Sequence, residues 1–124
     1  TINLMKLSAL ILISGLILTI ASCTDDSGSS NDCAGIVATY STTVKSVLDA
    51  SCALAGCHSG ANPANGFNFS NYAGAKSVAT TSGEKILCAI NQSGNCSPMP
   101  KGGSKLEATT IKLITCWVDA GAPQ

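Results

Sequence analysis

The chain contains one histidine, His58, and it follows a cysteine directly in the segment Cys52-Ala-Leu-Ala-Gly-Cys57-His58. Two thiols followed at once by an imidazole are typical of a segment that holds a c-type haem, with thioethers from the cysteines and iron ligation by the histidine. The usual spacer between the cysteines has two residues, whereas this chain has four. Gly56 allows a tight turn between the two thiols. The motif predicts a fold built around one covalent haem.

The N-terminal residues have the layout of a secretory signal. A positive start, Met5-Lys6, precedes mostly apolar residues at 7–20 and small residues at 21–22. This order predicts a signal peptide over residues 1–22, with the chain starting at Met5 and residues 1–4 lying upstream of that start. An uncleaved transmembrane anchor is the alternative, but the apolar run is shorter than the roughly 18 residues that such an anchor needs.

The end of the signal, Ile20-Ala-Ser-Cys23, resembles a bacterial lipobox. That resemblance implies a lipidated Cys23 as the first mature residue and a protein attached to a membrane through its acyl chains. Residues 24–32 are polar or glycine and predict a flexible tether, so that the lipid site and tether cover residues 23–32. The acidic pair Asp25-Asp26 resembles a surface-export signal. We expect a location in the Gram-negative cell envelope, on the periplasmic or the outer-membrane and cell-surface side.

The remaining residues, 33–124, are enough for one small domain. Such a domain buries a small share of its surface and often needs staples or a cofactor. Seven lysines, no arginine and seven acidic residues leave a net charge near −1 once Lys6 is removed. This balance argues against nucleic acid as a partner. No P-loop, dinucleotide fingerprint, zinc-protease motif or nucleophile elbow occurs in the sequence.

Seven cysteines in a secreted chain indicate disulfides. With Cys23 lipidated and the two motif cysteines assigned to haem, an even remainder is left: Cys33, Cys88, Cys96 and Cys116. Cys88 and Cys96 bracket a turn-rich segment, which favours a local bridge between them. Cys33 and Cys116 would then tie the start of the domain to its last helix. Four cysteines allow three connectivities, so this pairing is a preference.

An apolar stripe at helical spacing precedes the haem motif. It consists of Val44, Val47 and Leu48. The spacing predicts a short helix that leads directly into Cys52, with Ser41 or Thr42 capping its start. Residues 59–71 contain many glycines, prolines and asparagines and predict a loop. Three aromatic residues are expected to fold back from it onto the core: Phe67, Phe69 and Tyr72.

Two further helical segments are predicted after this loop, one from Ser70 or Asn71 to Ala79, and one that starts at Ser82 and carries Ile86, Leu87 and Ile90. Residues 91–103 predict an irregular segment.

The last helix has the clearest pattern. Glu107 is expected at its cap between the stapling residues Leu106 and Ile111, and Gly121 ends it. Its apolar arc consists of Ile111, Leu113, Ile114, Trp117 and Val118. Together these segments predict a mostly α fold with about three to five short helices and long loops.

A six-coordinate haem iron needs two axial ligands, for which histidine, methionine and lysine are the candidates. His58 is the only histidine, and Met99 is the only methionine that remains once Met5 leaves with the signal peptide. Prolines on both sides of Met99 fix its backbone outside any helix. His58 and Met99 are therefore the predicted metal ligands, and Pro63 is expected to accept a hydrogen bond from the second nitrogen of the imidazole.

This order of helix, Cys-Cys-His, loop, Met-Pro and a final helix ending in Trp-Val-Asp-Ala-Gly-Ala resembles the single-haem, class I type of cytochrome c. The resemblance covers about residues 40–122 and is strongest to the lipid-anchored and membrane-associated domains of this type. The four-residue spacer between the cysteines departs from the pattern of the family. It implies a small cytochrome c-like fold over residues 33–124. It also implies these site residues: His58 as proximal ligand, Met99 as distal ligand, Cys52 and Cys57 as thioether sites, and Trp117 packing near the haem.

The resemblance implies an electron carrier with no enzymatic activity of its own. Methionine–histidine ligation raises the reduction potential, and filled axial positions leave no open site for a substrate. The expected partners are redox proteins met through small, transient contacts, including the case of an electron-transfer subunit in a larger oxidoreductase.

Two other functions remain open at this point. Cys52, Cys57, His58 and Met99 are soft ligands that suit copper, which would make the protein a copper-binding lipoprotein. Alternatively, Cys52 and Cys57 form one more disulfide in a haem-free structural or adhesive lipoprotein.

Overall fold

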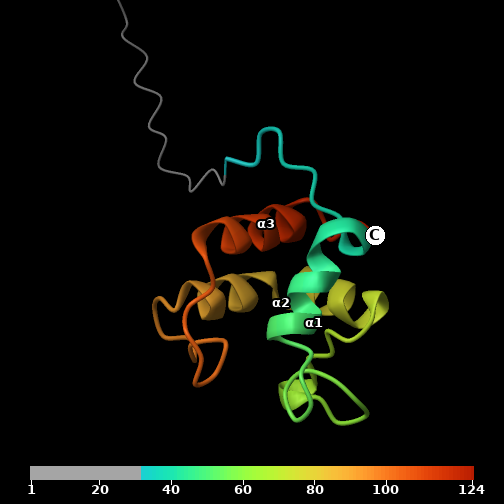
Figure 1. Cartoon of the computed structure of the whole chain (residues 1–124), viewed down its shortest axis with the longest axis vertical. Coiled ribbons are helices and arrows are strands. Elements are labelled where there is room, and N and C mark those ends of the chain that lie inside the picture. The colour runs from blue at the N-terminus through green and yellow to red at the C-terminus, as the bar shows by residue number, and fades with distance from the viewer. Residues whose placement is uncertain (1–31) are drawn as a thin grey trace, which may run out of the picture.

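The computed structural model describes residues 32–124, shown in Figure 1. Three α-helices form this part of the chain: α1 (Lys45–Ser51), α2 (Tyr72–Asn91) and α3 (Ala108–Asp119). A π-helical turn, Tyr40–Val44, leads into α1, and a short 3₁₀ turn, Ala64–Gly66, lies in the loop before α2. No strand occurs in residues 32–124. The predicted mostly α class, with a few helices and long loops, is confirmed.

Three predictions concern residues outside the described range: the signal peptide at 1–22 with its start at Met5, the lipid site at Cys23, and the tether. Within residues 32–124, no helix combines the length and apolar content required to cross a bilayer.

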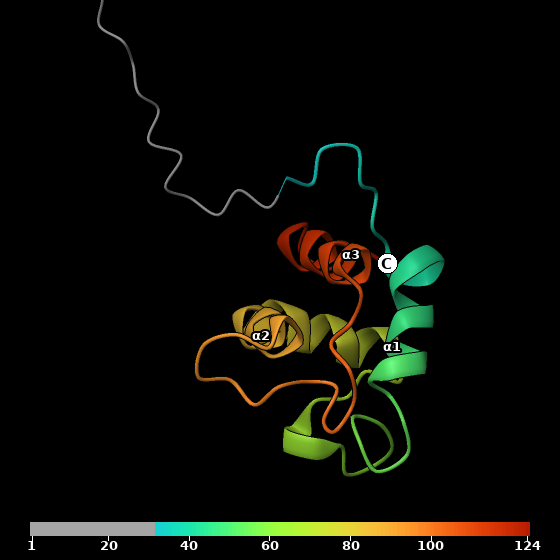
Figure 2. The same ribbon diagram turned by 60° about the vertical axis from the view of Figure 1, so that its left-hand side comes forward.

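Helices α2 and α3 lie side by side, and α1 packs beside one end of this pair (Figures 1 and 2). Segment 32–39, in cyan, lies next to α3, whereas loop 52–71, in green, lies at the opposite end of the domain in both views. The main core forms where the three helices meet, around Trp117, which is 1% exposed. A second apolar cluster of Ile90, Ile111 and Ile114 holds α2 against α3. Burial of these side chains is the main force that stabilises so short a set of helices.

Helix α2 contains the two helical segments predicted from the sequence. Its backbone breaks at Ser82, which has the non-helical angles φ −142° and ψ 25°. Ser82 and Gly83 are weak helix formers, so the break falls where propensity is lowest. Asn71 caps the start by accepting a hydrogen bond from the Gly74 N–H at 2.9 Å. Gly74 also admits the preceding loop, because a Cβ there would lie 2.5 Å from the Asn68 carbonyl oxygen.

The predicted start of the first helix is wrong by two or three residues. Helical backbone begins at Tyr40, and Thr39 rather than Ser41 or Thr42 precedes it. Two contacts explain the earlier start. The Tyr40 N–H donates to the Pro123 carbonyl at 2.9 Å, and the Thr43 hydroxyl donates to the Thr39 carbonyl at 2.8 Å. The first of these bonds joins the start of the domain to its C-terminal residues.

The start of α3 agrees with the prediction. Glu107 precedes its first residue, and the Glu107 carbonyl accepts the Ile111 N–H at 3.0 Å. Leu106 packs against the cluster that contains Ile111, as the predicted staple requires. The helix ends at Asp119, two residues before Gly121, whose φ of +79° suits glycine.

Two disulfides connect these elements. Cys33 is bonded to Cys116, and Cys88 is bonded to Cys96, which confirms the preferred pairing. Cys116 is 3% exposed on α3, so the first bond fastens the start of the domain to its core. The second bond fastens loop 92–107 to α2.

Candidate functional site

The segment from Cys52 to His58 folds into a hydrogen-bonded loop at the end of α1. The Cys52 N–H continues the helix by donating to the Leu48 carbonyl at 2.8 Å, and the Cys52 carbonyl accepts the His58 N–H at 3.1 Å. Gly56 has φ +77°, the left-handed conformation that the predicted turn needs. The four-residue spacer bulges into solvent, where Leu54 is 47% exposed. The loop thus brings the backbones of Cys52 and His58 together and carries the spacer outward.

His58 lies in an aromatic environment provided by loop 59–71. The imidazole is 8% exposed, with the Phe69 ring centroid at 5.3 Å in an edge-on arrangement and the Phe67 centroid at 6.2 Å. The Phe69 N–H donates to the His58 carbonyl at 2.8 Å, which holds the loop against the histidine. Phe69 is buried, and Phe67 and Tyr72 pack partly buried against the core. The predicted fold-back of these three aromatic residues is confirmed.

One nitrogen of the imidazole has a fixed partner. His58 Nδ1 lies 3.2 Å from the Ala64 carbonyl oxygen. The predicted partner, Pro63, is wrong by one residue: the Pro63 carbonyl instead accepts the Gly66 N–H at 2.9 Å in the 3₁₀ turn. A carbonyl only accepts, so this contact places the proton on Nδ1 and leaves a lone pair on Nε2. That tautomer is the one in which Nε2 can bind a metal.

Met99 lies on loop 92–107, which is held against the end of α2. The Met99 N–H donates to the Ala89 carbonyl at 3.0 Å, and the Met99 carbonyl accepts from Gln92 Nε2 at 3.3 Å. The Cys88–Cys96 disulfide fixes the same loop three residues earlier. These bonds restrict the position of the Met99 backbone beside α2.

A mostly apolar cavity of about 510 Å³ lies between loops 52–71 and 92–107 and helix α2. Its lining includes Cys52, His58 and Met99. Apolar side chains form most of the rest: Leu48, Phe67, Phe69, Ile86, Ala89, Ile90 and Ile114. The structure therefore places three of the predicted site residues, from segments far apart in sequence, around a single cavity.

Cys57 and Trp117 are not among the residues that line this cavity. Cys57 is exposed, and neither it nor Cys52 takes part in a disulfide. Trp117 lies in the main core, where its ring centroid is 6.4 Å from that of Tyr40. Its indole N–H donates to the Pro123 carbonyl at 2.8 Å, which holds the C-terminal residues against the core.

The cavity also has polar residues that the sequence did not reveal: Asn65, Lys85 and Ser97. Lys85 directly precedes Ile86, the first of the apolar residues expected in this part of α2. In the folded protein, Lys85 lines the cavity together with Asn65, Phe67 and Phe69 of loop 59–71. A search of charged residues beside predicted core positions would have selected it.

Burial makes the Cys52 thiol less acidic than an ordinary thiol. Desolvation, with a smaller contribution from Cys57, raises the pKa of Cys52 from 9.0 to about 11. A shift of this size lowers the thiolate fraction near pH 8 about 100-fold relative to an ordinary thiol. Since the thiolate is the nucleophile, Cys52 is protonated and slow to react.

We therefore expect iodoacetamide to modify the exposed Cys57 of the haem-free protein first. At pH 8, Cys52 should react on the order of 100-fold more slowly, and its rate should rise as the pH approaches 11. Mass spectrometry of the peptide that carries both thiols measures the two rates, and full denaturation is the control that should make them similar. Equal rates in the folded protein would contradict the burial of Cys52.

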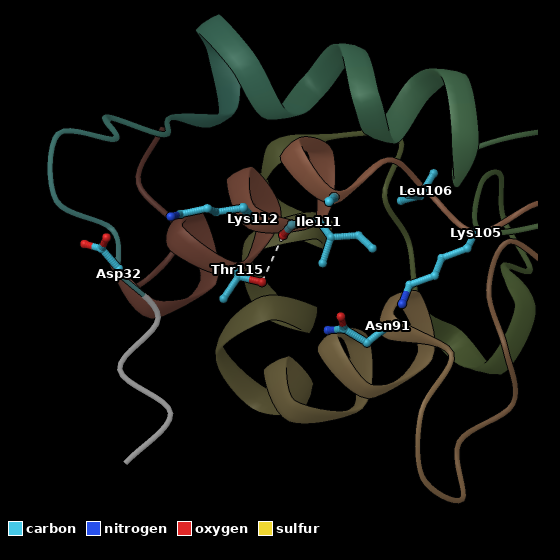
Figure 3. Close-up of a pocket in the computed structure, with 8 residues that line it drawn as sticks. Asp32, Asn91, Lys105, Leu106, Ile111, Lys112 and Thr115 are labelled. Atoms are coloured by element: carbon cyan, nitrogen blue, oxygen red, sulfur yellow. Dashed lines mark hydrogen bonds between the residues drawn. The ribbon is translucent and has the colours of Figure 1, made fainter. Parts of the chain in front are cut away.

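A second cavity, of about 580 Å³, lies beside α3. Figure 3 shows Lys112 and Asp32 on one side of it and Lys105 and Asn91 on the other. The hydroxyl of Thr115 donates to the Ile111 carbonyl at 2.9 Å, along the dashed line in the figure, and is therefore already used within α3. The cavity is lined by none of the predicted site residues, so we assign the candidate site to the smaller, apolar cavity.

Comparisons with known proteins return no match: no family model, no curated protein and no solved structure is similar to this chain. Within residues 32–124, no group of three or more His, Cys, Asp or Glu side chains has an arrangement that could hold a metal ion.

Proposed function

We propose that the protein is a membrane-tethered monohaem c-type cytochrome that passes single electrons between redox proteins and catalyses no reaction of its own. The observation that carries this proposal is that Cys52, His58 and Met99 line one apolar cavity. The same three side chains are a thioether-forming thiol, an imidazole and a thioether, which is the donor set of a c-type haem with methionine–histidine ligation.

The cavity suits a haem in size and in chemistry. Its volume of about 510 Å³ falls in the range of roughly 300–1,000 Å³ that is usual for cofactor sites. Isoleucine, leucine and phenylalanine side chains offer the porphyrin an apolar surface, and Lys85 and Asn65 supply polar groups in the lining. When bound, the haem supplies one-electron chemistry.

The chain's own residues orient and shield that group. The Ala64 carbonyl holds the Nδ1 proton of His58, so that Nε2 is the nitrogen available to iron. Phe67 and Phe69 pack around the imidazole and exclude water from it. Burial in this apolar shell disfavours the additional positive charge of the oxidised state, and a methionine ligand acts in the same direction. Both effects favour a comparatively high reduction potential.

The proposed location is the envelope of a Gram-negative bacterium, with the lipid on Cys23 and the cavity on the periplasmic or cell-surface side. Two disulfides in one small domain support an oxidising compartment. The envelope is also where c-type haems are attached.

Expression of the full chain with a cytochrome maturation system tests the proposal. We expect a haem-stained band on a denaturing gel and a sharp α-band in the reduced-minus-oxidised spectrum. His58→Gln should abolish the native spectrum, because it removes the only histidine. Lys112→Gln, in the second cavity, is the matched control and should keep it.

Absence of covalent haem from the wild-type protein would refute the proposal. Copper uptake by that haem-free protein, lost in Cys52→Ser and His58→Gln, would instead favour the copper-binding alternative. Uptake of neither would favour the disulfide-stapled structural protein.

A further inference from the structure

We infer that the haem is attached through one thioether only, at Cys52, and that Cys57 stays a free thiol on the surface. The inference rests on the proposed haem function and goes beyond it, because the Cys-Cys-His pattern by itself predicts two thioethers. It follows from a difference between the two cysteines: Cys52 lines the cavity, whereas Cys57 is exposed and is not among the lining residues.

Cys52 is held in place by the end of α1. Its N–H continues the helical hydrogen bonds, and its side chain packs partly buried against the main core. It shares the cavity with His58 and Met99. A porphyrin held by those two residues would share this cavity with the Cys52 thiol.

Backbone hydrogen bonds on both of its sides hold Cys57 outside the cavity. Its N–H donates to the Leu54 carbonyl at 3.0 Å, and its carbonyl accepts the Ala64 N–H at 2.8 Å. The first bond closes the turn that contains Gly56, and the second joins the motif to the 3₁₀ turn that positions His58. Moving the Cys57 backbone toward the cavity would break these bonds, including the one that joins the motif to the turn on which the orientation of the imidazole depends. The four-residue spacer thus forms a closed turn that separates the second thiol from the haem site.

The attachment is an addition that needs no oxidant. The Cys52 S–H bond and the π bond of one vinyl group break, a C–S bond forms at the vinyl carbon next to the ring, and the hydrogen ends on the terminal carbon. No atom leaves and no electron is lost. The second vinyl group and the Cys57 thiol both remain intact.

Because the addition loses no atoms, the mass of the protein is the same with one thioether or two, and a thiol count is the informative measurement. Holoprotein is denatured without reductant, alkylated with iodoacetamide and digested with trypsin. Cleavage after Lys45 and Lys76 releases a peptide that contains Cys52 and Cys57 and no other cysteine. Cys23 and the two disulfides therefore do not affect the result.

We expect this peptide to carry one haem and one alkyl group, and alkylation of the native holoprotein to give the same product because Cys57 is exposed. A haem peptide without an alkyl group would overturn the inference while leaving the proposed function intact. A peptide without haem would overturn both.

Two variants locate the bond. Cys57→Ser should keep haem on a denaturing gel, and Cys52→Ser should lose it. Loss of covalent haem in Cys57→Ser would show that Cys52 alone does not hold the haem. Covalent haem in Cys52→Ser would place the bond on Cys57. Either result contradicts the inference.

Discussion

Replacing Met99 with leucine is expected to lower the reduction potential of the haem-loaded protein by a large part of the roughly 0.8 V range over which axial ligands act. Leucine keeps the size and apolar character of the side chain, so the cavity stays filled, but it offers no lone pair to a metal. The ferric form should also lose the absorption that arises from sulfur–iron ligation. A potentiometric titration followed by visible spectroscopy measures both effects.

Ile86→Leu is the matched control for this experiment. Ile86 lines the same cavity from α2, and the substitution conserves its volume. The control should keep both the potential and the sulfur–iron absorption. If Met99→Leu keeps them as well, Met99 is not the distal ligand, and Lys85, the lysine in the cavity lining, becomes the residue to test.

The second large effect is expected from the disulfide that spans the domain. Replacing both Cys33 and Cys116 with serine should lower the free energy of unfolding by about 4.5 kcal/mol in the chain-entropy description of disulfides, since the bond joins residues 83 positions apart. A small domain with few aromatic residues has little stability in reserve. Denaturant unfolding of the haem-free protein, followed by far-UV circular dichroism, measures the loss.

The second disulfide provides an internal control. Cys88 and Cys96 are only 8 positions apart, and the same description gives about 2.5 kcal/mol for a loop of that length. Replacing this pair with serine should therefore cost about 2 kcal/mol less than replacing Cys33 and Cys116. Equal losses would show that native packing around the bonds, rather than restriction of the unfolded chain, determines their contribution.

Features specified by local sequence were predictable. Asn71 at the start of α2, the break at Ser82 and the turn at Gly56 each follow from the intrinsic preference of a single residue, and the start of α3 after Glu107 follows from the apolar pair Leu106 and Ile111. The disulfide pairing was predictable because the four cysteines combine a turn-rich local pair with one distant pair. The coarse helical architecture follows from the same local signals.

Features set by contacts between distant segments were not predictable. The first helix starts at Tyr40 because the Tyr40 N–H donates a hydrogen bond to the carbonyl of Pro123, a residue far away in the sequence. Within loop 59–71, the imidazole contacts the Ala64 carbonyl while the Pro63 carbonyl accepts the Gly66 N–H, a detail of backbone geometry that residue spacing does not specify. Lys85 borders the cavity only because loop 59–71 packs there. The class I cytochrome resemblance stays a prediction, and the haem measurements described above decide it.

The Cys33–Cys116 bond has a consequence for how the domain meets its surroundings. It fixes the point where the chain enters the domain beside α3, at the end opposite loop 52–71 (Figures 1 and 2). If Cys23 is lipidated, the ten residues to Cys33 limit the distance between the lipid site and the start of the domain to about 35 Å. The attachment point would then lie at the α3 end of the domain, opposite loop 52–71. Under the proposed function, attachment at this end would leave loop 52–71 accessible to a soluble redox partner.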